Sequence, residues 1–283
     1  MSTIQGIITP LATPLTPTGD AIDQEGTRRL LNHVISGGVS GIFILGSTGE
    51  GPSLSSRLGR EFVTLCCALV PEIRQQIMDS DDMGGEYDED NDFSILVCVS
   101  DTCTEESIAM AAHAADCGAD AIVVCPPYYF PMTQAELASY VRRVVENTTL
   151  PLFLYNIPIC CKNAYEIETI EELVFWAGGE RIVGIKDSSF DLDFMSQLCR
   201  IKKEVCPSLS VLTGAEHHVV EVINMGGDGG VVGGSNIFPE AFVSFYQGGV
   251  TGNEAMENNA RQKIEALKAI YDIANGRFVQ ATK

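Results

Sequence analysis

Eight short apolar runs alternate with longer amphipathic segments along most of the chain, and this alternation constrains the fold more than any other feature. Each run is as short as a buried strand, and the segment after it has the spacing of a helix. The expected strands are residues 4–9, 41–45, 94–99, 121–125, 151–155, 182–185, 210–212 and 230–232. The expected helices between them are residues 23–36, 55–69, 104–117, 133–146, 168–177, 191–203 and 216–225. Strands alternating with helices predict a parallel sheet, and eight such units predict a (β/α)8 TIM barrel of the α/β class, with a doubly wound open sheet as the alternative.

Length and composition suit one barrel-sized unit. The chain has 283 residues, of which 45% are hydrophobic. We expect the barrel to span residues 1–237 and a short helical extension to span residues 238–283. An acidic insertion at about residues 79–92 contains eight Asp or Glu among fourteen residues. Because it lacks the central glycine and terminal glutamate of a calcium-binding loop, we interpret it as a solvated segment on the barrel face opposite the active site.

Charge and cysteine use narrow the class of protein further. With 18 basic and 38 acidic residues the formal net charge is -20, so nucleic acid and anionic membranes are not expected partners. No apolar run approaches the roughly 18 residues of a membrane span, and the first residues lack the pattern of a signal peptide, so we expect a cytoplasmic protein. The ten cysteines contain no CxxC pair and lie mostly in apolar runs, which indicates free buried thiols rather than disulfides.

One lysine stands where an expected buried strand ends. Lys186 follows the apolar run 182–185 and precedes three small polar residues, Asp187 to Ser189. Burial disfavours an ammonium, so the pKa of Lys186 should be lowered, which suits Schiff-base formation with a carbonyl substrate. The alternative is a lysine that reaches past the strand end into solvent.

Other polar groups follow other expected strands, and in a TIM barrel such groups meet at one rim. In the glycine-flanked segment 46–50, the hydroxyls of Ser47 and Thr48 could hold a carboxylate or relay a proton, although a plain turn is the alternative. Tyr155 ends the strand before that of Lys186, so a phenol and an amine would reach one carbonyl. Tyr129 lies in the proline-rich loop 126–131, where a ring packs or is presented to a neighbouring subunit.

These motifs, in this order and at these strand positions, resemble the dihydrodipicolinate synthase and N-acetylneuraminate lyase family of pyruvate-handling barrel enzymes. The resemblance implies that Lys186 forms a Schiff base with pyruvate or a 2-keto acid and that Tyr155 transfers protons. It implies that Ser47 and Thr48 bind the pyruvate carboxylate and link the relay, and that Tyr129 completes the site of a neighbouring subunit. The family therefore implies a homo-oligomer, a dimer or a tetramer, and no cofactor beyond the covalent lysine imine.

Some residues of this chain differ from those that family members use to bind the second substrate, and these differences indicate which substrate is expected. Dihydrodipicolinate synthases carry a carboxylate-binding arginine where this chain has Cys160, and Lys162 is only a partial substitute. The chain also ends sooner after the last strand than most members, which puts the usual final helix and its oligomer contacts in question.

Further positions favour a polyhydroxy substrate. Sialic acid lyases have a glycine and two acids after the seventh strand, and here Gly214 and Glu216 remain while His217 replaces the second acid. Ser188 supplies a hydroxyl two residues after the lysine, and the glycine-rich segment 226–235, which includes Val232, leaves the last strand end open.

We therefore expect a lyase that reversibly cleaves a sugar-acid or hydroxy-keto-acid type 2-keto acid to pyruvate and an aldehyde. The alternatives are 4-hydroxy-tetrahydrodipicolinate synthase, which joins pyruvate and aspartate semialdehyde, a 2-keto-3-deoxy sugar acid dehydratase, and a catalytically silent barrel. A metal-dependent aldolase is disfavoured, because the adjacent histidines of segment 216–218 point about 100° apart on a helix. A phosphate-binding barrel using Gly233 and Gly234 lacks a nearby basic residue.

Overall fold

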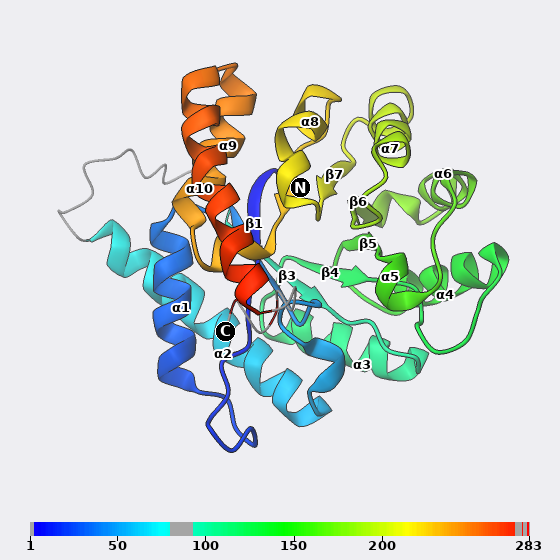
Figure 1. Cartoon of the computed structure of the whole chain (residues 1–283). Coiled ribbons are helices and arrows are strands. Elements are labelled where there is room, and N and C mark those ends of the chain that lie inside the picture. The colour runs from blue at the N-terminus through cyan, green and yellow to red at the C-terminus, as the bar shows by residue number, and fades with distance from the viewer. Residues whose placement is uncertain (1–2, 80–92, 275–278, 280–281, 283) are drawn as a thin grey trace. The chain divides into compact units, whose positions relative to one another are not determined.

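Eight strands close into a barrel in the order β1 to β8 in the computed structural model, which describes residues 3–79, 93–274, 279 and 282. The strands are β1 (Gly6–Pro10), β2 (Gly41–Ile44), β3 (Ser94–Cys98), β4 (Ala121–Val124), β5 (Leu152–Asn156), β6 (Ile182–Asp187), β7 (Ser210–Thr213) and β8 (Gly229–Val231). The described ladders between neighbouring strands are parallel. The predicted (β/α)8 barrel is thus confirmed, and the open sheet is excluded (Figure 1).

Helices fall where the amphipathic segments predict them. They are α1 (Gln24–Ser36), α2 (Ser56–Met78), α3 (Thr104–Asp116), α4 (Gln134–Glu146), α5 (Pro158–Cys161), α6 (Ile167–Phe175), α7 (Leu192–Glu204), α8 (Val219–Asn224), α9 (Pro239–Thr251) and α10 (Glu254–Ile273). Short 3-10 turns are η1 (Gly51–Ser53), η2 (Gly179–Arg181), η3 (Glu216–His218) and η4 (Gly233–Asn236). Polar caps fix several helix starts: the Ser55 side chain accepts a hydrogen bond from the Leu58 amide, and Thr133 forms a capping box with Glu136.

Two predicted helices differ from the structure. Helix α2 passes Pro71 and ends at Met78, because Val70, Ile73 and Ile77 continue its buried face beyond the predicted end at residue 69. The segment predicted as one helix, 216–225, begins instead as the turn η3 and becomes α-helical only at Val219. Most of the acidic insertion, residues 80–92, lies outside the described residues.

The polypeptide divides into two compact units. The first combines Met1–Gln5 with Leu96–Val231, and the second combines Gly6–Ile95 with Val232–Lys283. The boundary predicted at residue 237 between a barrel domain and an extension stays a prediction.

The first unit contains the β5–β6–β7 ladders, and helices α4, α6 and α7 follow one another along the outer side of these strands (Figure 1). Leu152 pairs with Ile182 whereas Phe153 pairs with Gly184, so Val183 is an extra residue in β6. Gly184 is required here, because a Cβ on it would lie 2.1 Å from the Phe153 ring. From this bulge onward the register is regular up to the strand ends.

The second unit joins β1 and β2 to the carboxyl-terminal helices. Ser235 donates a hydrogen bond to Thr9 at 2.9 Å, and Asn236 donates to the Pro10 carbonyl at 2.9 Å, so the turn η4 is fixed to β1. Helices α9 and α10 lie side by side (Figure 1).

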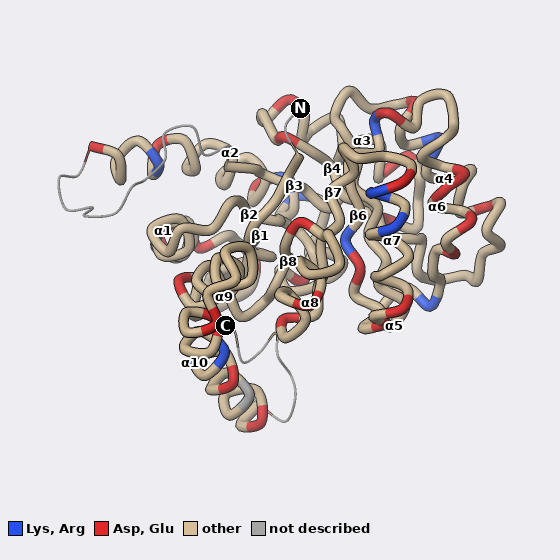
Figure 2. The backbone as a smooth tube through the Cα atoms, turned by 90° about the horizontal axis from the view of Figure 1, so that it is seen from above, with Lys and Arg blue, Asp and Glu red and all other residues tan. Residues whose placement is uncertain are grey.

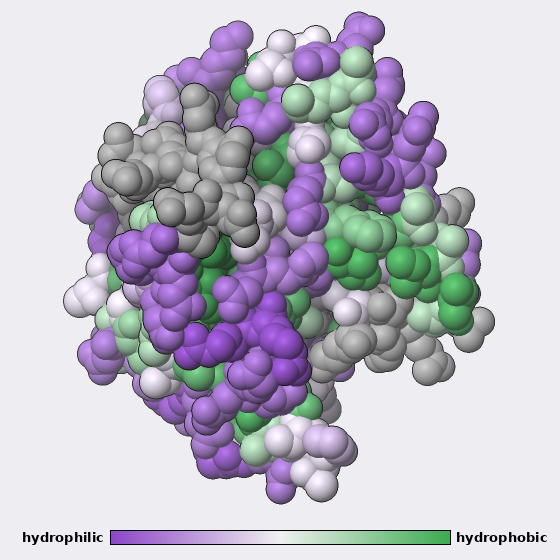
Figure 3. Space-filling model, turned by 90° about the vertical axis from the view of Figure 1, so that its left-hand side faces the viewer, coloured by the Kyte–Doolittle hydropathy of each residue, from purple (hydrophilic) through white to green (hydrophobic). Residues whose placement is uncertain are grey.

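Outside the acidic insertion, the described acidic residues are spread over many helices. Asp and Glu lie on most helices of both units and outnumber Lys and Arg along the tube (Figure 2). The face shown in Figure 3 is mainly hydrophilic, with hydrophobic side chains in smaller groups between the polar ones.

Candidate active site

Lys186 lies near the carboxyl end of β6, inside the barrel rather than in solvent. The residue is only 5% exposed. Burial lowers the pKa of Lys186 from 10.5 to about 7, which outweighs the opposing effect of the thiols of Cys98, Cys125 and Cys160. A substantial fraction of the amine is therefore neutral near pH 7, as nucleophilic attack on a carbonyl requires. The alternative of a solvent-directed lysine is wrong.

Tyr155 is the direct neighbour of Lys186 across the β5–β6 ladder. The two residues are register partners, and the Lys186 Nζ lies 4.2 Å from the centroid of the Tyr155 ring. Tyr155 is 3% exposed, so both groups share one buried environment. The structure thus brings together the amine and the phenol that their strand positions predict to be adjacent.

A hydrogen-bonded pair behind these residues ties the two strand ends together. Asn156 donates to the Asp187 carboxylate at 2.8 Å and accepts from the Tyr165 amide at 3.2 Å. The other carboxylate oxygen of Asp187 accepts from the Ser189 hydroxyl at 2.8 Å. Burial raises the pKa of Asp187, whereas Asn156 and Ser189 lower it. Sequence reasoning missed this pair, although each member directly follows a predicted site residue.

Ser188 and Gly214 lie side by side beyond the ends of β6 and β7. The Ser188 amide donates to the Asn156 carbonyl at 2.8 Å, and the Gly214 amide donates to the Asp187 carbonyl at 2.7 Å. A Cβ on Gly214 would lie 2.1 Å from the Ser188 hydroxyl, so the glycine makes room for that serine. Glu216 follows in η3 and is half-buried. The structure brings Ser188 and Gly214 together at the strand ends, and their role in binding substrate stays a prediction.

Three thiols form a cluster that the sequence analysis treated only as core filling. Cys125 is in hydrogen-bond contact with both Cys98 and Cys161, and its amide donates to the Ser100 hydroxyl at 2.7 Å. In the β4–β5 ladder, Val123 pairs with Phe153. Cys125 and Tyr155 each follow two residues later and so lie at the same level of the barrel. Cys125 therefore continues the same row across the barrel as Tyr155 and Lys186. Its place beside the site follows from the strand register rather than from a local sequence signal.

Two predicted rim residues are exposed. Cys160 lies in α5 and is exposed, contrary to the expectation that the cysteines are buried, and Lys162 follows with a left-handed φ of 59°. Tyr129 is 74% exposed and its ring packs edge-on against Phe130, which is 72% exposed. These side chains thus face outward from the first unit.

The remaining predicted residues belong to the second unit. Ser47 and Thr48 follow β2 in a tight loop, where Leu45 and Glu50 adopt left-handed φ values of 61° and 54°. Thr48 is buried at 5% exposure, and Ser47 is half-buried. Val232 is buried, and its amide donates to the Ile8 carbonyl at 3.3 Å. Their placement relative to Lys186 stays a prediction.

Neither a cluster of metal-ligating side chains nor a membrane-spanning helix occurs among the described residues. The described part of the chain contains no group of three or more His, Cys, Asp or Glu side chains that could hold a metal ion. Among those same residues, no helix is long and apolar enough to cross a membrane.

A buried lysine with a lowered pKa, paired with a phenol at the carboxyl end of adjacent barrel strands, defines the class of imine-forming barrel lyases. The chain belongs to the dihydrodipicolinate synthetase family, whose model matches residues 3–72 and 90–280.

Individual relatives cover most of the chain. It is 30% identical over 275 residues to the probable 2-dehydro-3-deoxy-D-pentonate aldolase YjhH of Escherichia coli (strain K12), covering 96% of this chain and 83% of that protein. The crystal structure of YagE from E. coli K12 in complex with pyruvate is 27% identical, with a TM-score of 0.85 over 98% of this chain and 86% of that one. Dihydrodipicolinate synthase from Bacteroides thetaiotaomicron is 35% identical, with a TM-score of 0.85 over 100% and 88% of the two chains.

Proposed function

We propose that this protein is a class I aldolase that reversibly cleaves a 2-keto acid of the sugar-acid or hydroxy-keto-acid type to pyruvate and an aldehyde. The observation that carries the proposal is the Lys186 amine, buried at a strand end with its pKa lowered to about 7. Membership of the family and the names of relatives that are 2-keto-3-deoxy sugar acid aldolases support it.

The proposed chemistry uses Lys186 as the nucleophile. Its neutral amine adds to the C2 carbonyl of the substrate, and the carbinolamine loses water to give a protonated imine. The imine draws the electron pair of the C3–C4 bond as that bond breaks, the C4 hydroxyl loses its proton, and an aldehyde and an enamine result. Protonation of the enamine at C3 and hydrolysis of the imine then release pyruvate and restore the amine.

In this proposal Tyr155 moves these protons. With its ring 4.2 Å from Nζ, the phenol can donate to the departing carbinolamine oxygen and accept the C4 hydroxyl proton in the next step. Burial of both residues excludes bulk water from the imine. Ser47, Thr48 and the Val232 strand end would hold the pyruvate moiety, as the family resemblance implies, and no cofactor is needed.

Substrate choice would rest on the rim of the first unit. A synthase joining pyruvate and aspartate semialdehyde is the second candidate, favoured by the 35% identity to the Bacteroides synthase. That substrate brings a second carboxylate, and position 160 offers a thiol instead of a guanidinium. The Ser188 hydroxyl beside Gly214 suits a neutral polyhydroxy aldehyde better.

Reduction with borohydride in the presence of pyruvate tests the proposal. Intact mass should increase by one reduced pyruvate adduct, peptide mapping should place it on Lys186, and Lys186→Ala should gain none. Lys203→Ala, which removes an exposed lysine from α7, is the matched control and should be labelled like the native chain. A folded native chain that acquires no adduct would refute the aldolase. If the adduct forms, cleavage of 2-keto-3-deoxy sugar acids compared with condensation of aspartate semialdehyde decides between the two candidates.

A further inference from the structure

A second cavity lies at the opposite end of β6 from Lys186. Its volume is about 480 Å³, within the range of small-molecule sites. Ile182 and Val183 line it at the start of β6, whereas Lys186 lies four residues later, roughly 13 Å along an extended strand. The cavity is therefore separate from the proposed aldolase site, and all of its lining residues belong to the first compact unit.

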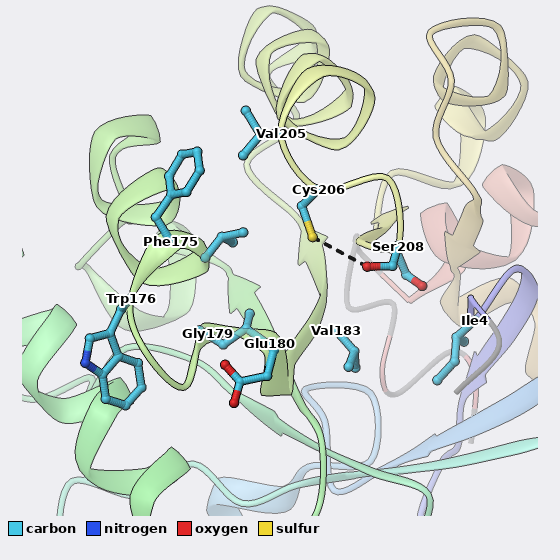
Figure 4. Close-up of a pocket in the computed structure, with 12 residues that line it drawn as sticks. Ile4, Phe175, Trp176, Gly179, Glu180, Val183, Val205, Cys206 and Ser208 are labelled. Atoms are coloured by element: carbon cyan, nitrogen blue, oxygen red, sulfur yellow. Dashed lines mark hydrogen bonds between the residues drawn. The ribbon is translucent and has the colours of Figure 1, made fainter.

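The walls of the cavity are largely apolar and come from two segments. Phe175 and Trp176, at the end of α6, lie on one side, and Val205 and Cys206, before β7, lie on the other (Figure 4). Phe175 is 70% exposed, which is unusual for a phenylalanine and places its ring at the entrance. The extra residue at Val183 interrupts the β5–β6 ladder beside the cavity.

A buried hydroxyl lines the cavity without a partner. Ser210 is 1% exposed, and its Oγ has no hydrogen-bond partner among the described protein groups. Leaving such a hydroxyl unpaired is unfavourable. The oxygen is itself out of contact with solvent, so a polar group in the cavity would be bound after a rotation of the Ser210 side chain toward it. Ser208 offers a second hydroxyl, which shares a 3.6 Å hydrogen bond with the Cys206 thiol (Figure 4).

Among the described residues that line the cavity, Glu180 alone is charged. Glu180 accepts a hydrogen bond from the Gly178 amide at 2.9 Å, and no described basic side chain forms an ion pair with it. The nearby arginines have partners of their own, and the Arg142 guanidinium also lies over the ring of the lining residue Trp176, 5.5 Å from its centroid. The Arg181 guanidinium donates to the carbonyls of residues 145, 148 and 150, and the Arg142 guanidinium pairs with Glu172 at 2.5 Å.

From this arrangement we propose that the cavity binds a small organic ammonium ion with an apolar body. The apolar part packs between the α6 end and the segment before β7, the Ser210 hydroxyl bonds to the ligand's polar group, and Glu180 balances its positive charge. An anionic ligand is disfavoured, because it would meet the Glu180 carboxylate without a basic lining residue to offset it.

Calorimetric titration with phenethylammonium chloride tests the site directly. Its isosteric relatives, 2-phenylethanol and 3-phenylpropionate, separate the contribution of charge from that of the apolar body. We expect one saturable site with affinity in the order ammonium, alcohol, carboxylate, unchanged by saturating pyruvate. Equal binding of the three probes, competition by pyruvate or absence of saturation would each overturn the proposal.

Two variants locate the binding. Glu180→Gln should weaken phenethylammonium binding about threefold to tenfold, a modest effect because the carboxylate is partly solvated. Glu168→Gln, which neutralises an exposed carboxylate in the first turn of α6, should leave binding unchanged. Ser210→Ala should weaken binding about fivefold while leaving the unfolding temperature of the free protein unchanged or higher, because it removes an unpaired hydroxyl. A Ser210→Ala protein that unfolds at lower temperature, or variants that bind like the native chain, would refute the site.

Discussion

At the scale of single residues, the burial that suits Lys186 to imine chemistry also destabilises the fold. Its pKa in the folded chain is about 7, against 10.5 for a solvated lysine. Between these two pH values the unfolded chain binds more protons than the folded one, so the Lys186 contribution to the free energy of unfolding rises with pH across this window. Below about pH 7 the folded protein must bury an ammonium ion.

Replacing this lysine should therefore stabilise the protein at neutral pH. Lys186→Met keeps the apolar stem and removes the ammonium, so its free energy of unfolding should exceed that of the native chain at pH 7. The excess should shrink by on the order of 5 kcal/mol as the pH rises to 10.5, because each pKa unit corresponds to about 1.4 kcal/mol. Urea unfolding of the native chain and of Lys186→Met between pH 7 and pH 10.5 measures this difference in unfolding free energy.

The exposed Lys203→Met serves as the control for that measurement. Titration of cysteines and tyrosines in the same range cancels when native and variant curves are subtracted. A stability difference between Lys186→Met and the native chain that stays constant with pH would show that Lys186 is not desolvated in the folded protein.

At the scale of elements, the active site depends on how the ends of β5 and β6 are held in register. Tyr155 and Lys186 face each other, and the next pair, Asn156 and Asp187, is joined by a 2.8 Å hydrogen bond. Asp187 is 2% exposed and Asn156 is also 2% exposed, so neither can exchange this bond for water without local opening. The pair thus holds in register the two strand ends that carry the phenol and the amine.

Removing this link should slow imine formation as well as weaken the fold. Asn156→Ala leaves the Tyr165 amide and one Asp187 oxygen without their partner, which should cost about 2 kcal/mol in unfolding free energy. The rate of borohydride trapping with pyruvate should fall while Lys186 remains the labelled residue. Asn147→Ala removes a comparable but exposed side-chain bond, to the Arg143 carbonyl, and should change neither quantity appreciably. A trapping rate unaffected by Asn156→Ala would assign the pair a purely structural role.

Strands and helices could be predicted from the sequence where the local spacing of apolar and polar residues determines where they begin and end. The apolar run before Lys186 placed β6, and the amphipathic segments predicted from residues 55 and 133 placed the starts of α2 and α4 within one residue. The end of α2 could not be predicted in this way. The buried face of the helix continues past Pro71 and overrides the local effect of the proline. The thiol cluster and the Asn156–Asp187 pair depend on strand register, which aligns residues 31 positions apart and leaves no local signal.

At the scale of the whole molecule, large hydrophobic side chains stand exposed on the loops that follow β4, β5 and β6. They are Tyr129, Phe130, Ile159 and Phe190, each at least 64% exposed. Exposed aromatic groups of this kind are typical of interfaces between proteins. We propose that they contact a second copy of the chain and that Tyr129 reaches the neighbour's active site, as the family resemblance implies.

Two substitutions separate assembly from catalysis. Phe130→Asp places a charge in the proposed interface, so sedimentation velocity should show a shift from dimer or tetramer to monomer, with at least a tenfold loss of cleavage rate. Tyr129→Phe keeps the ring but removes the hydroxyl, so the assembly should persist while the rate of imine formation falls about tenfold or more. Phe175→Asp charges an equally exposed ring on the amino-terminal side of the first unit and should leave the assembly intact. A Phe130→Asp protein that sediments like the native chain would place the interface elsewhere, and a fully active Tyr129→Phe would remove the shared hydroxyl from the mechanism.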